Sequence, residues 1–153
     1  MFRINPSDKF NRSYKELLKR HYKGEKAKKV FQDFVVQIIQ KLSSNPFLPG
    51  SFAEGWPGSL SKPEEWEFRK YYFDMPNLQG AARQGRLMYL VDRTRSAIEL
   101  TWIYTHSEFP KRPPDKNLKQ LLAELIESQQ EEENLSESND DDDDGESTSS
   151  NDR

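Results

Sequence analysis

The sequence predicts an α+β domain in which an N-terminal strand and a helical hairpin pack on a small antiparallel sheet, followed by a C-terminal helix and a disordered acidic tail. Three observations support this class. Apolar residues recur at helical spacing between positions 8 and 44, alternate as in strands between 66 and 106, and almost vanish after 127. A chain of 153 residues accommodates one domain, which we place at residues 1–127, with the tail at 128–153.

The first third of the chain is expected to form a strand and two helices. Residues 2–4 favour a short strand, and Ser7 or Asp8 is suited to cap the helix that follows. Gly24 is expected to end that helix, and a second one then spans about residues 26–44, with a broad apolar stripe that must be buried. Residues 45–65 contain four prolines and three glycines, which predicts a long loop without regular structure.

The middle of the chain predicts a three-stranded antiparallel meander. In the first strand, residues 66–73, alternation places Arg69 and Lys70 on opposite faces. A polar connection over 74–84 leads to the second strand, residues 87–91, and a turn at 92–96 leads to the third. One face of the third strand is expected to carry Ile98, Leu100, Trp102, Tyr104 and His106. Prolines then end the sheet, and a helix is predicted from Asp115 to about Glu133.

The net charge of −3 is the sum of two opposed parts. Residues 1–127 contain 22 Lys and Arg against 15 Asp and Glu, a charge of +7, whereas residues 128–153 contain 1 against 11, a charge of −10. A basic body suggests an anionic partner, with nucleic acid or a ribosome surface first among the candidates. An ordinary solvated surface is the alternative interpretation.

The composition also limits which metal or disulfide chemistry the protein can have and in which cellular compartment we expect it. Without cysteine, neither a disulfide framework nor a thiolate zinc site is possible, and two histidines far apart in the sequence argue against a metal cluster. The N-terminus lacks a signal-peptide pattern, and no apolar run is long enough to span a bilayer. We therefore expect a soluble cytoplasmic protein with no metal, no small-molecule cofactor and no membrane partner.

Residues 85–113 carry the candidate site. His106 follows the third strand, and Phe109, Lys111 and Arg112 lie just beyond it. An imidazole, an aromatic ring and cations at one rim of a sheet can bind a phosphodiester and transfer protons to or from it.

Each of these residues also has a purely structural interpretation. A histidine at a strand end is commonly a half-buried surface residue, and Phe109 can simply cap the hydrophobic edge of the sheet. Arg86, on the second strand, can pair with a carboxylate such as Asp92 or Glu99.

The order of elements resembles the RelE/ParE superfamily of toxins from bacterial toxin–antitoxin pairs. The resemblance covers about residues 1–125. It is carried by an FKxxYK-like helix start at residues 10–15, by Arg86-Leu87-Met88-Tyr89 in place of a Y-R-L-x-Y strand, and by residues 105–109 in place of an H-x-x-Y/F strand end. The chain departs from the family pattern in its longer loops at 45–65 and 77–84, in its acidic tail, and at Gly85, where the family has an aromatic residue.

The resemblance implies a function and a set of site residues. Members of the RNA-cleaving branch cut messenger RNA, commonly in the ribosomal decoding site, with the RNA 2′-hydroxyl as nucleophile and no metal. By resemblance, His106 is the general acid or base, Arg86 stabilises the phosphate, and Phe109 stacks on a base. Basic residues expected to assist in RNA binding are Arg69, Lys70, Arg83, Lys111 and Arg112. An antitoxin protein, mRNA and the ribosome are the implied partners.

Two other functions remain open at the level of sequence. The chain can be a non-catalytic binder of the same fold, either a ParE-like topoisomerase inhibitor or an RNA- or ribosome-binding module. It can also be a plain interaction protein whose basic domain is masked by its own tail. The histidine in its H-x-x-F setting favours cleavage, whereas the lack of a second histidine or a clear acid–base pair favours binding alone.

Overall fold

The computed structural model describes residues 1–149, with side chains described through Glu132. The elements follow one another as β1 (Arg3–Pro6), α1 (Asp8–His21), α2 (Glu25–Ser44), β2 (Ser51–Ala53), β3 (Trp66–Asp74), α3 (Gly80–Arg83), β4 (Gln84–Asp92), β5 (Ala97–Thr105) and α4 (Asp115–Ser149). The strands form one sheet in the order β1-β5-β4-β3-β2. The predicted α+β class, helical hairpin, three-strand meander and C-terminal helix are confirmed.

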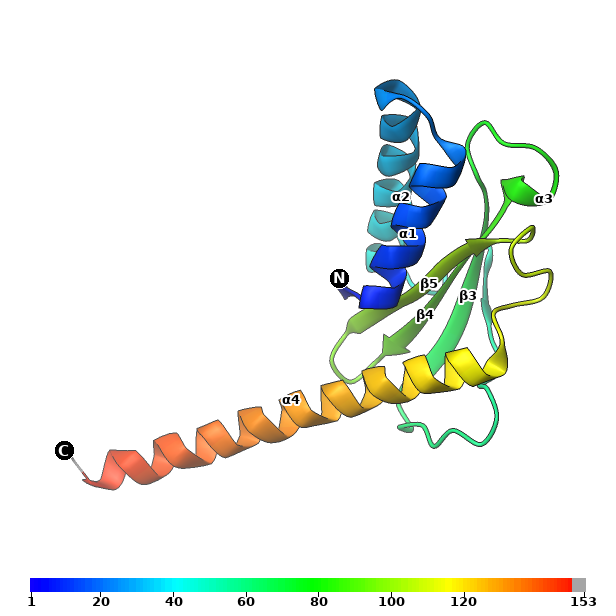
Figure 1. The fold of residues 1–153 in the computed structure, drawn as a ribbon. Coiled ribbons are helices and arrows are strands. Elements are labelled where there is room, and N and C mark those ends of the chain that lie inside the picture. Colours follow the sequence, from blue (N-terminus) through cyan, green and yellow to red (C-terminus); the bar gives the residue numbers. More distant parts are fainter. Residues whose placement is uncertain (150–153) are drawn as a thin grey trace.

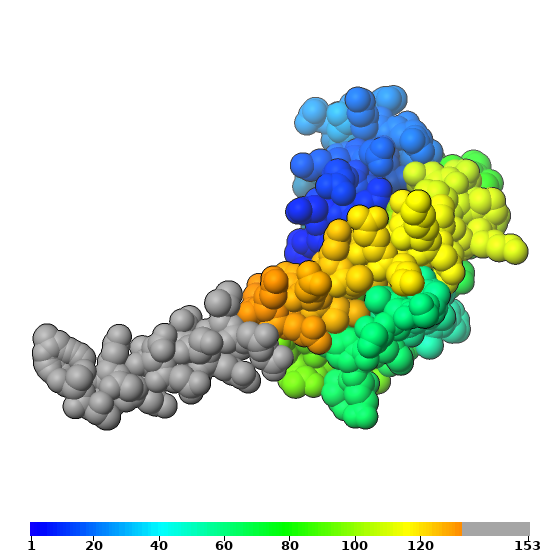
Figure 2. Space-filling view, turned by 60° about the horizontal axis from the view of Figure 1, so that its bottom comes forward, coloured from blue at the N-terminus to red at the C-terminus, as the bar shows by residue number. Residues whose placement is uncertain are grey.

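Helices cover both faces of the sheet (Figure 1). The hairpin of α1 and α2 lies on one face, which we call the hairpin face, and α4 crosses the other, which we call the α4 face. Figure 2 shows α4 lying across the body, with α1 on one side of it and the loop between β2 and β3 on the other. Each face has its own hydrophobic cluster, because successive side chains of a strand point to opposite faces.

Two local features of the sequence start helix α1 and reverse the chain between α1 and α2. Ser7 caps α1 as predicted, since its hydroxyl accepts a hydrogen bond of 3.0 Å from the Phe10 amide. Helix α1 ends at His21, and Gly24 forms the N-cap of α2 instead of the end of α1. Its φ of 85° lies in the left-handed region that favours glycine, which lets the chain reverse between the two helices.

The loop predicted between residues 45 and 65 contains a strand. Residues Ser51–Ala53 form β2 and pair antiparallel with β3, so the expectation of no regular structure there is wrong. Proline and glycine flank this three-residue segment without interrupting it, and the edge of β3 supplies hydrogen-bond partners that the local sequence does not reveal. The strand closes the sheet next to the predicted site.

A β-bulge in β5, the third strand of the meander, changes the face of the sheet to which its side chains point. Met88 of β4 pairs with Trp102, whereas the next residue, Tyr89, pairs with Leu100, which leaves Thr101 as an extra residue on β5. Ile98 and Leu100 therefore join the hairpin-face cluster, while Trp102 and Tyr104 join the α4-face cluster. The prediction that all these residues share one face with His106 is wrong for that reason.

Helix α4 packs on the sheet further along the chain than expected. Its apolar side carries the buried residues Leu118, Leu122 and Ile126, as predicted. Gln129 is also buried, and Arg95 donates to its side chain at 2.8 Å, so packing continues past the predicted domain boundary at residue 127.

The backbone of α4 then remains helical to Ser149, where the sequence predicted a disordered tail. No proline interrupts this segment, and a helix already nucleated by packing extends at little cost per residue. The last four residues of the predicted tail, 150–153, lie outside the described residues. None of the helices described for this chain is both long and apolar enough to cross a membrane.

Candidate functional site

Two exposed aromatic rings and one half-buried guanidinium mark one end of the α4 face. Phe52 and Tyr72 are 59% and 41% exposed, and their ring centroids lie 5.7 Å apart in an edge-to-face arrangement. The guanidinium of Arg86 lies over the Tyr72 ring, 4.3 Å from its centroid. The pairing of Tyr72 with Arg86, and of Phe52 with Lys70, brings these side chains to one face. We call Phe52, Tyr72 and Arg86 the aromatic platform; rings and guanidinium groups of this kind stack on nucleic-acid bases.

A buried ion-pair cluster adjoins the aromatic platform. The Glu54 carboxylate lies 3.4 Å from Lys70 Nζ and 3.0 Å from an Arg112 nitrogen, and we call these three residues the Glu54 cluster. Arg112 also donates to the Gly55 carbonyl at 2.7 Å and to Asp115 at 2.9 Å. Burial alone lowers the pKa of Arg112, but the hydrogen bonds to Glu54 and Asp115 outweigh it and raise the pKa. The guanidinium therefore stays charged.

Tyr104 lies on β5 opposite Arg86 and is fully buried. Among the residues with described side chains, none forms a hydrogen bond with its hydroxyl. Burial raises the pKa of Tyr104, and the nearby negative charge of Glu54 raises it further. The hydroxyl is therefore neutral and remains able to donate.

His106 directly follows the last residue of β5 and lies in a turn that hydrogen bonds hold on both sides. Its amide donates to the Gln84 carbonyl at 2.9 Å, and Arg86 approaches the Gln84 side chain at 3.5 Å, so both residues meet at Gln84. Glu108 closes the turn by accepting from the Thr105 amide at 3.1 Å and from Arg20 at 3.3 Å. No described side chain hydrogen-bonds the half-buried His106 ring. A fixed backbone and an unengaged imidazole suit proton transfer.

The structure separates two of the predicted RNA-binding residues from this group. Arg69 points to the hairpin face, where it is buried and donates to the Ser51 hydroxyl and carbonyl at 2.9 Å each. It also pairs with Glu67. Arg69 therefore holds β2 to β3, and because it is buried on the hairpin face it is not available to RNA. Lys70, the next residue of β3, points to the α4 face instead. Arg83 lies on α3, exposed, and pairs with Asp74 at 3.0 Å.

Two further predicted residues, Phe109 and Lys111, lie on the segment between β5 and α4. Phe109 contacts Trp102 and Tyr104 edge to face, each at 5.7 Å between ring centroids, so it covers the edge of the α4-face cluster. Lys111 is exposed and lies next to Arg112 in the chain.

The alternative partners considered for Arg86 are engaged elsewhere. Asp92 pairs with Arg95 at 3.7 Å, and Glu99 accepts a hydrogen bond of 2.7 Å from Asn5. Arg86 instead donates to its neighbouring Gly85 carbonyl and stacks on Tyr72. Its positive charge is therefore not neutralised by either of those carboxylates.

Sequence reasoning missed four residues of this site: Phe52, Glu54, Tyr72 and Tyr104. Strand alternation already placed Tyr72 with Lys70, so a signal for that residue existed. Phe52 and Glu54 lie within the proline- and glycine-rich segment, and only the pairing of β2 reveals their face. The position of Tyr104 depends on the bulge at Thr101, which has no sequence signature.

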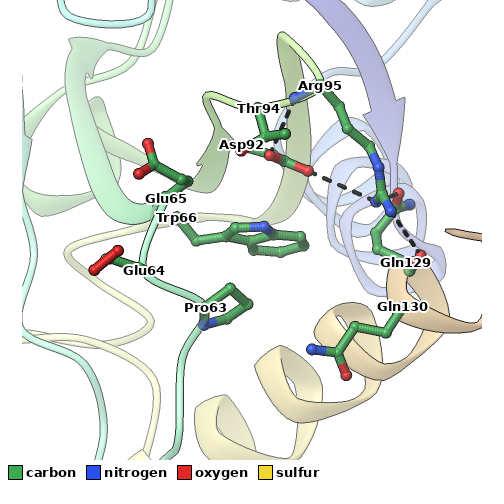
Figure 3. A pocket seen from close by; sticks show the side chains of 9 residues that line it. All are labelled: Pro63, Glu64, Glu65, Trp66, Asp92, Thr94, Arg95, Gln129 and Gln130. Carbon is green, nitrogen blue, oxygen red and sulfur yellow. Dashed lines mark hydrogen bonds and ion pairs between the residues drawn. The ribbon is translucent and has the colours of Figure 1, made fainter.

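A separate pocket lies at the opposite end of β3 (Figure 3). It measures about 180 Å³ and has Trp66 at its centre, with Asp92, Arg95 and Gln129 on one wall. The contacts of Arg95 with both Asp92 and Gln129 tie the β4–β5 turn to α4. We interpret this pocket as part of the joint that holds α4 in place. Within the described side chains, no group of three or more His, Asp or Glu is arranged to hold a metal ion.

The solved structures that are similar to this chain include two from Helicobacter pylori. One is described as a metal-bound toxin; it is 20% identical, with a TM-score of 0.45, over 71% of this chain and 99% of that one. The other is described as a conserved hypothetical protein; it is 18% identical, with a TM-score of 0.41, over 71% of this chain and 98% of that one. No protein-family model and no curated protein sequence matches the chain.

Proposed function

We propose that this protein is a RelE-type toxin, a metal-independent endoribonuclease that cuts messenger RNA at the ribosome and is neutralised by an antitoxin protein. One observation carries the proposal: Phe52 and Tyr72 form an exposed aromatic pair, and Arg86 stacks on Tyr72 at the corner of the sheet where His106 presents an unengaged imidazole. Stacking surfaces next to a cation suit single-stranded RNA.

The reaction that fits these groups is attack by the RNA's own 2′-hydroxyl. The 2′-oxygen forms a bond to phosphorus while the bond to the 5′-oxygen breaks, which leaves a 2′,3′-cyclic phosphate and a 5′-hydroxyl. One group must accept the 2′-hydroxyl proton and another must protonate the departing 5′-oxygen; His106 takes one of these roles. Arg86 stabilises the negative charge that develops on the phosphate.

Further contacts in this proposal come from the rim around the aromatic platform. Lys111 is an exposed cation that can contact a phosphate, and Phe109 supports the rim next to His106. The basic body, with a charge of +7 over residues 1–127, favours both an RNA substrate and an acidic antitoxin segment.

Substitution of the two central residues tests the proposal. We expect His106→Ala and Arg86→Ala each to reduce mRNA cleavage at least about a hundredfold, the effect of losing a general acid–base group or a charge stabiliser. The measurement is the mapping of mRNA ends after incubation of the full chain with translating ribosomes. Arg12→Ala, which removes an exposed α1 cation, is the matched control and should cleave normally. Normal cleavage by both site variants contradicts the catalytic assignment.

A non-catalytic RNA-binding module is the second candidate. It is favoured by the fact that the half-buried His106 has no second imidazole or carboxylate beside it among the described residues assigned to the site, while Tyr104 and Lys70 are buried. In the same experiment, this function predicts RNA binding that depends on Arg86 without new mRNA ends in the wild-type reaction.

A further inference from the structure

The Glu54 cluster places two cations around one carboxylate in a largely buried position. Lys70 is on β3 and Arg112 precedes α4, yet both reach the same Glu54 oxygen, at 3.4 and 3.0 Å. The side chains of Glu54, Lys70 and Arg112 are only 14%, 8% and 20% exposed. Buried ion pairs of this kind contribute little net stability, because removing the charges from water costs about as much as their attraction returns. Stability alone therefore does not account for this cluster, and we looked for a function for it.

The Tyr104 hydroxyl supplies an independent second observation. It is fully buried, it has no hydrogen-bond partner among the described side chains, and Tyr104 pairs across the sheet with Arg86, whose guanidinium lies over Tyr72. A buried donor without a partner is rare, and its cost is relieved when an acceptor arrives. Two cations and a neutral hydroxyl donor form the set of groups that binds a phosphate oxygen.

The position of the cluster connects it to the aromatic platform. Lys70 pairs with Phe52 across β2 and β3, and its Nζ lies 5.6 Å from the centre of the Tyr72 ring. A nucleotide whose base stacks on Phe52 and Tyr72 has its phosphate within reach of these cations. The carboxylate of Glu54 is the anion that pairs with both cations in the structure.

We propose that Lys70, Arg112 and Tyr104 form a phosphate-binding subsite, which the Glu54 carboxylate fills as an internal competitor until a phosphate of the RNA displaces it. This inference rests on the proposed function as far as the identity of the phosphate is concerned. It makes Glu54 a residue that limits affinity, so its removal should improve binding.

The test is the variant Glu54→Gln in the full chain. The amide keeps the shape and the hydrogen-bond acceptor of the carboxylate but removes its charge. We expect inorganic phosphate and single-stranded RNA each to bind about tenfold more tightly than to the wild type. The dependence of RNA affinity on salt should also steepen by about 0.7 in log–log slope, the value for one additional phosphate contact with a single strand.

Two further variants keep the test interpretable. Glu64→Gln removes the same charge from an exposed loop position and should leave both affinities unchanged. Glu54→Asp retains the charge but shortens its reach, so phosphate affinity should rise by a smaller factor; this variant decides the question if Glu54→Gln does not fold. Wild-type phosphate affinity in a folded Glu54 variant overturns the proposal.

The two probes separate failure of this inference from failure of the proposed function. Tighter binding of inorganic phosphate without any RNA binding supports the subsite and contradicts the RNA-cleaving function. RNA cleavage with unchanged phosphate and RNA affinity in both Glu54 variants supports the function and contradicts the subsite.

Discussion

The two faces of the sheet differ in how completely they are covered. On the hairpin face, α1 and α2 bury a continuous cluster in which the Tyr22 and Phe31 rings stack 4.7 Å apart. On the α4 face, the cluster is closed around Trp66 at the start of β3, whereas Phe52 and Tyr72 remain exposed toward the other end. The covered hairpin face therefore provides stability, and the uncovered end of the α4 face provides the candidate site.

We expect the largest effect on the free energy of unfolding from a substitution on the hairpin face, which we infer to be the main source of stability. Phe31 is fully buried, so Phe31→Ala removes its apolar contacts and leaves a cavity. We expect the free energy of unfolding to fall by about 3–5 kcal/mol, measured by urea denaturation. A loss below about 1 kcal/mol would show that the hairpin is not the main support of the sheet.

Arg69 and Lys70 are neighbours in the chain that lie on opposite faces of the sheet, so their substitution should affect different properties. Arg69→Met removes two buried hydrogen bonds to Ser51 of β2 and the pairing with Glu67 on β3, and we expect it to reduce the free energy of unfolding by about 2–3 kcal/mol. Lys70→Met should instead weaken RNA binding about tenfold or more, since hydrogen bonds to charged groups contribute about 1.5–3 kcal/mol. Denaturation and RNA titration of both variants check this; equal effects on both properties would contradict the division of roles.

Phe52 tests whether the uncovered end of the α4 face binds bases. Its ring is mostly exposed, so Phe52→Ala should change the free energy of unfolding by no more than about 0.5 kcal/mol. Loss of one stacking surface should weaken binding of single-stranded RNA by about 1–3 kcal/mol. Val36→Ala, at a similarly exposed apolar position on α2, is the control and should bind RNA normally. If both variants bind alike, the aromatic platform is not the RNA surface.

The smallest effect concerns the closed end of the α4 face. Burial raises the pKa of Glu99 above its ordinary value of 4.5, although the hydrogen bond from Asn5 lowers it. The folded chain therefore holds this proton more tightly, and the resulting stabilisation is complete below the ordinary pKa and lost as pH rises through the raised one. At pH 7 we expect Glu99→Gln to unfold at a higher temperature than the wild type. The difference should vanish below pH 4.5, and a difference independent of pH would contradict the assignment.

Periodicity correctly predicted the elements whose residues carry their own pattern. The apolar stripe of α2, the alternation of β3 and β4 and the Ser7 cap are properties of short stretches of sequence, so they appear in the structure as expected. Of the predicted site, Arg86 and His106 lie at one corner, whereas Arg69 was assigned a role that its face excludes.

The sequence by itself determined the class of fold, the basic body and the acidic C-terminal segment, because composition and hydrophobic period are written into neighbouring residues. Only the tertiary structure decided the rest. The strand β2, the bulge at Thr101 and the meeting of Glu54 with Lys70 and Arg112 depend on hydrogen bonds and ion pairs between distant segments. Such contacts form only once the sheet is assembled, and their geometry decides which cations face a substrate and which support the sheet.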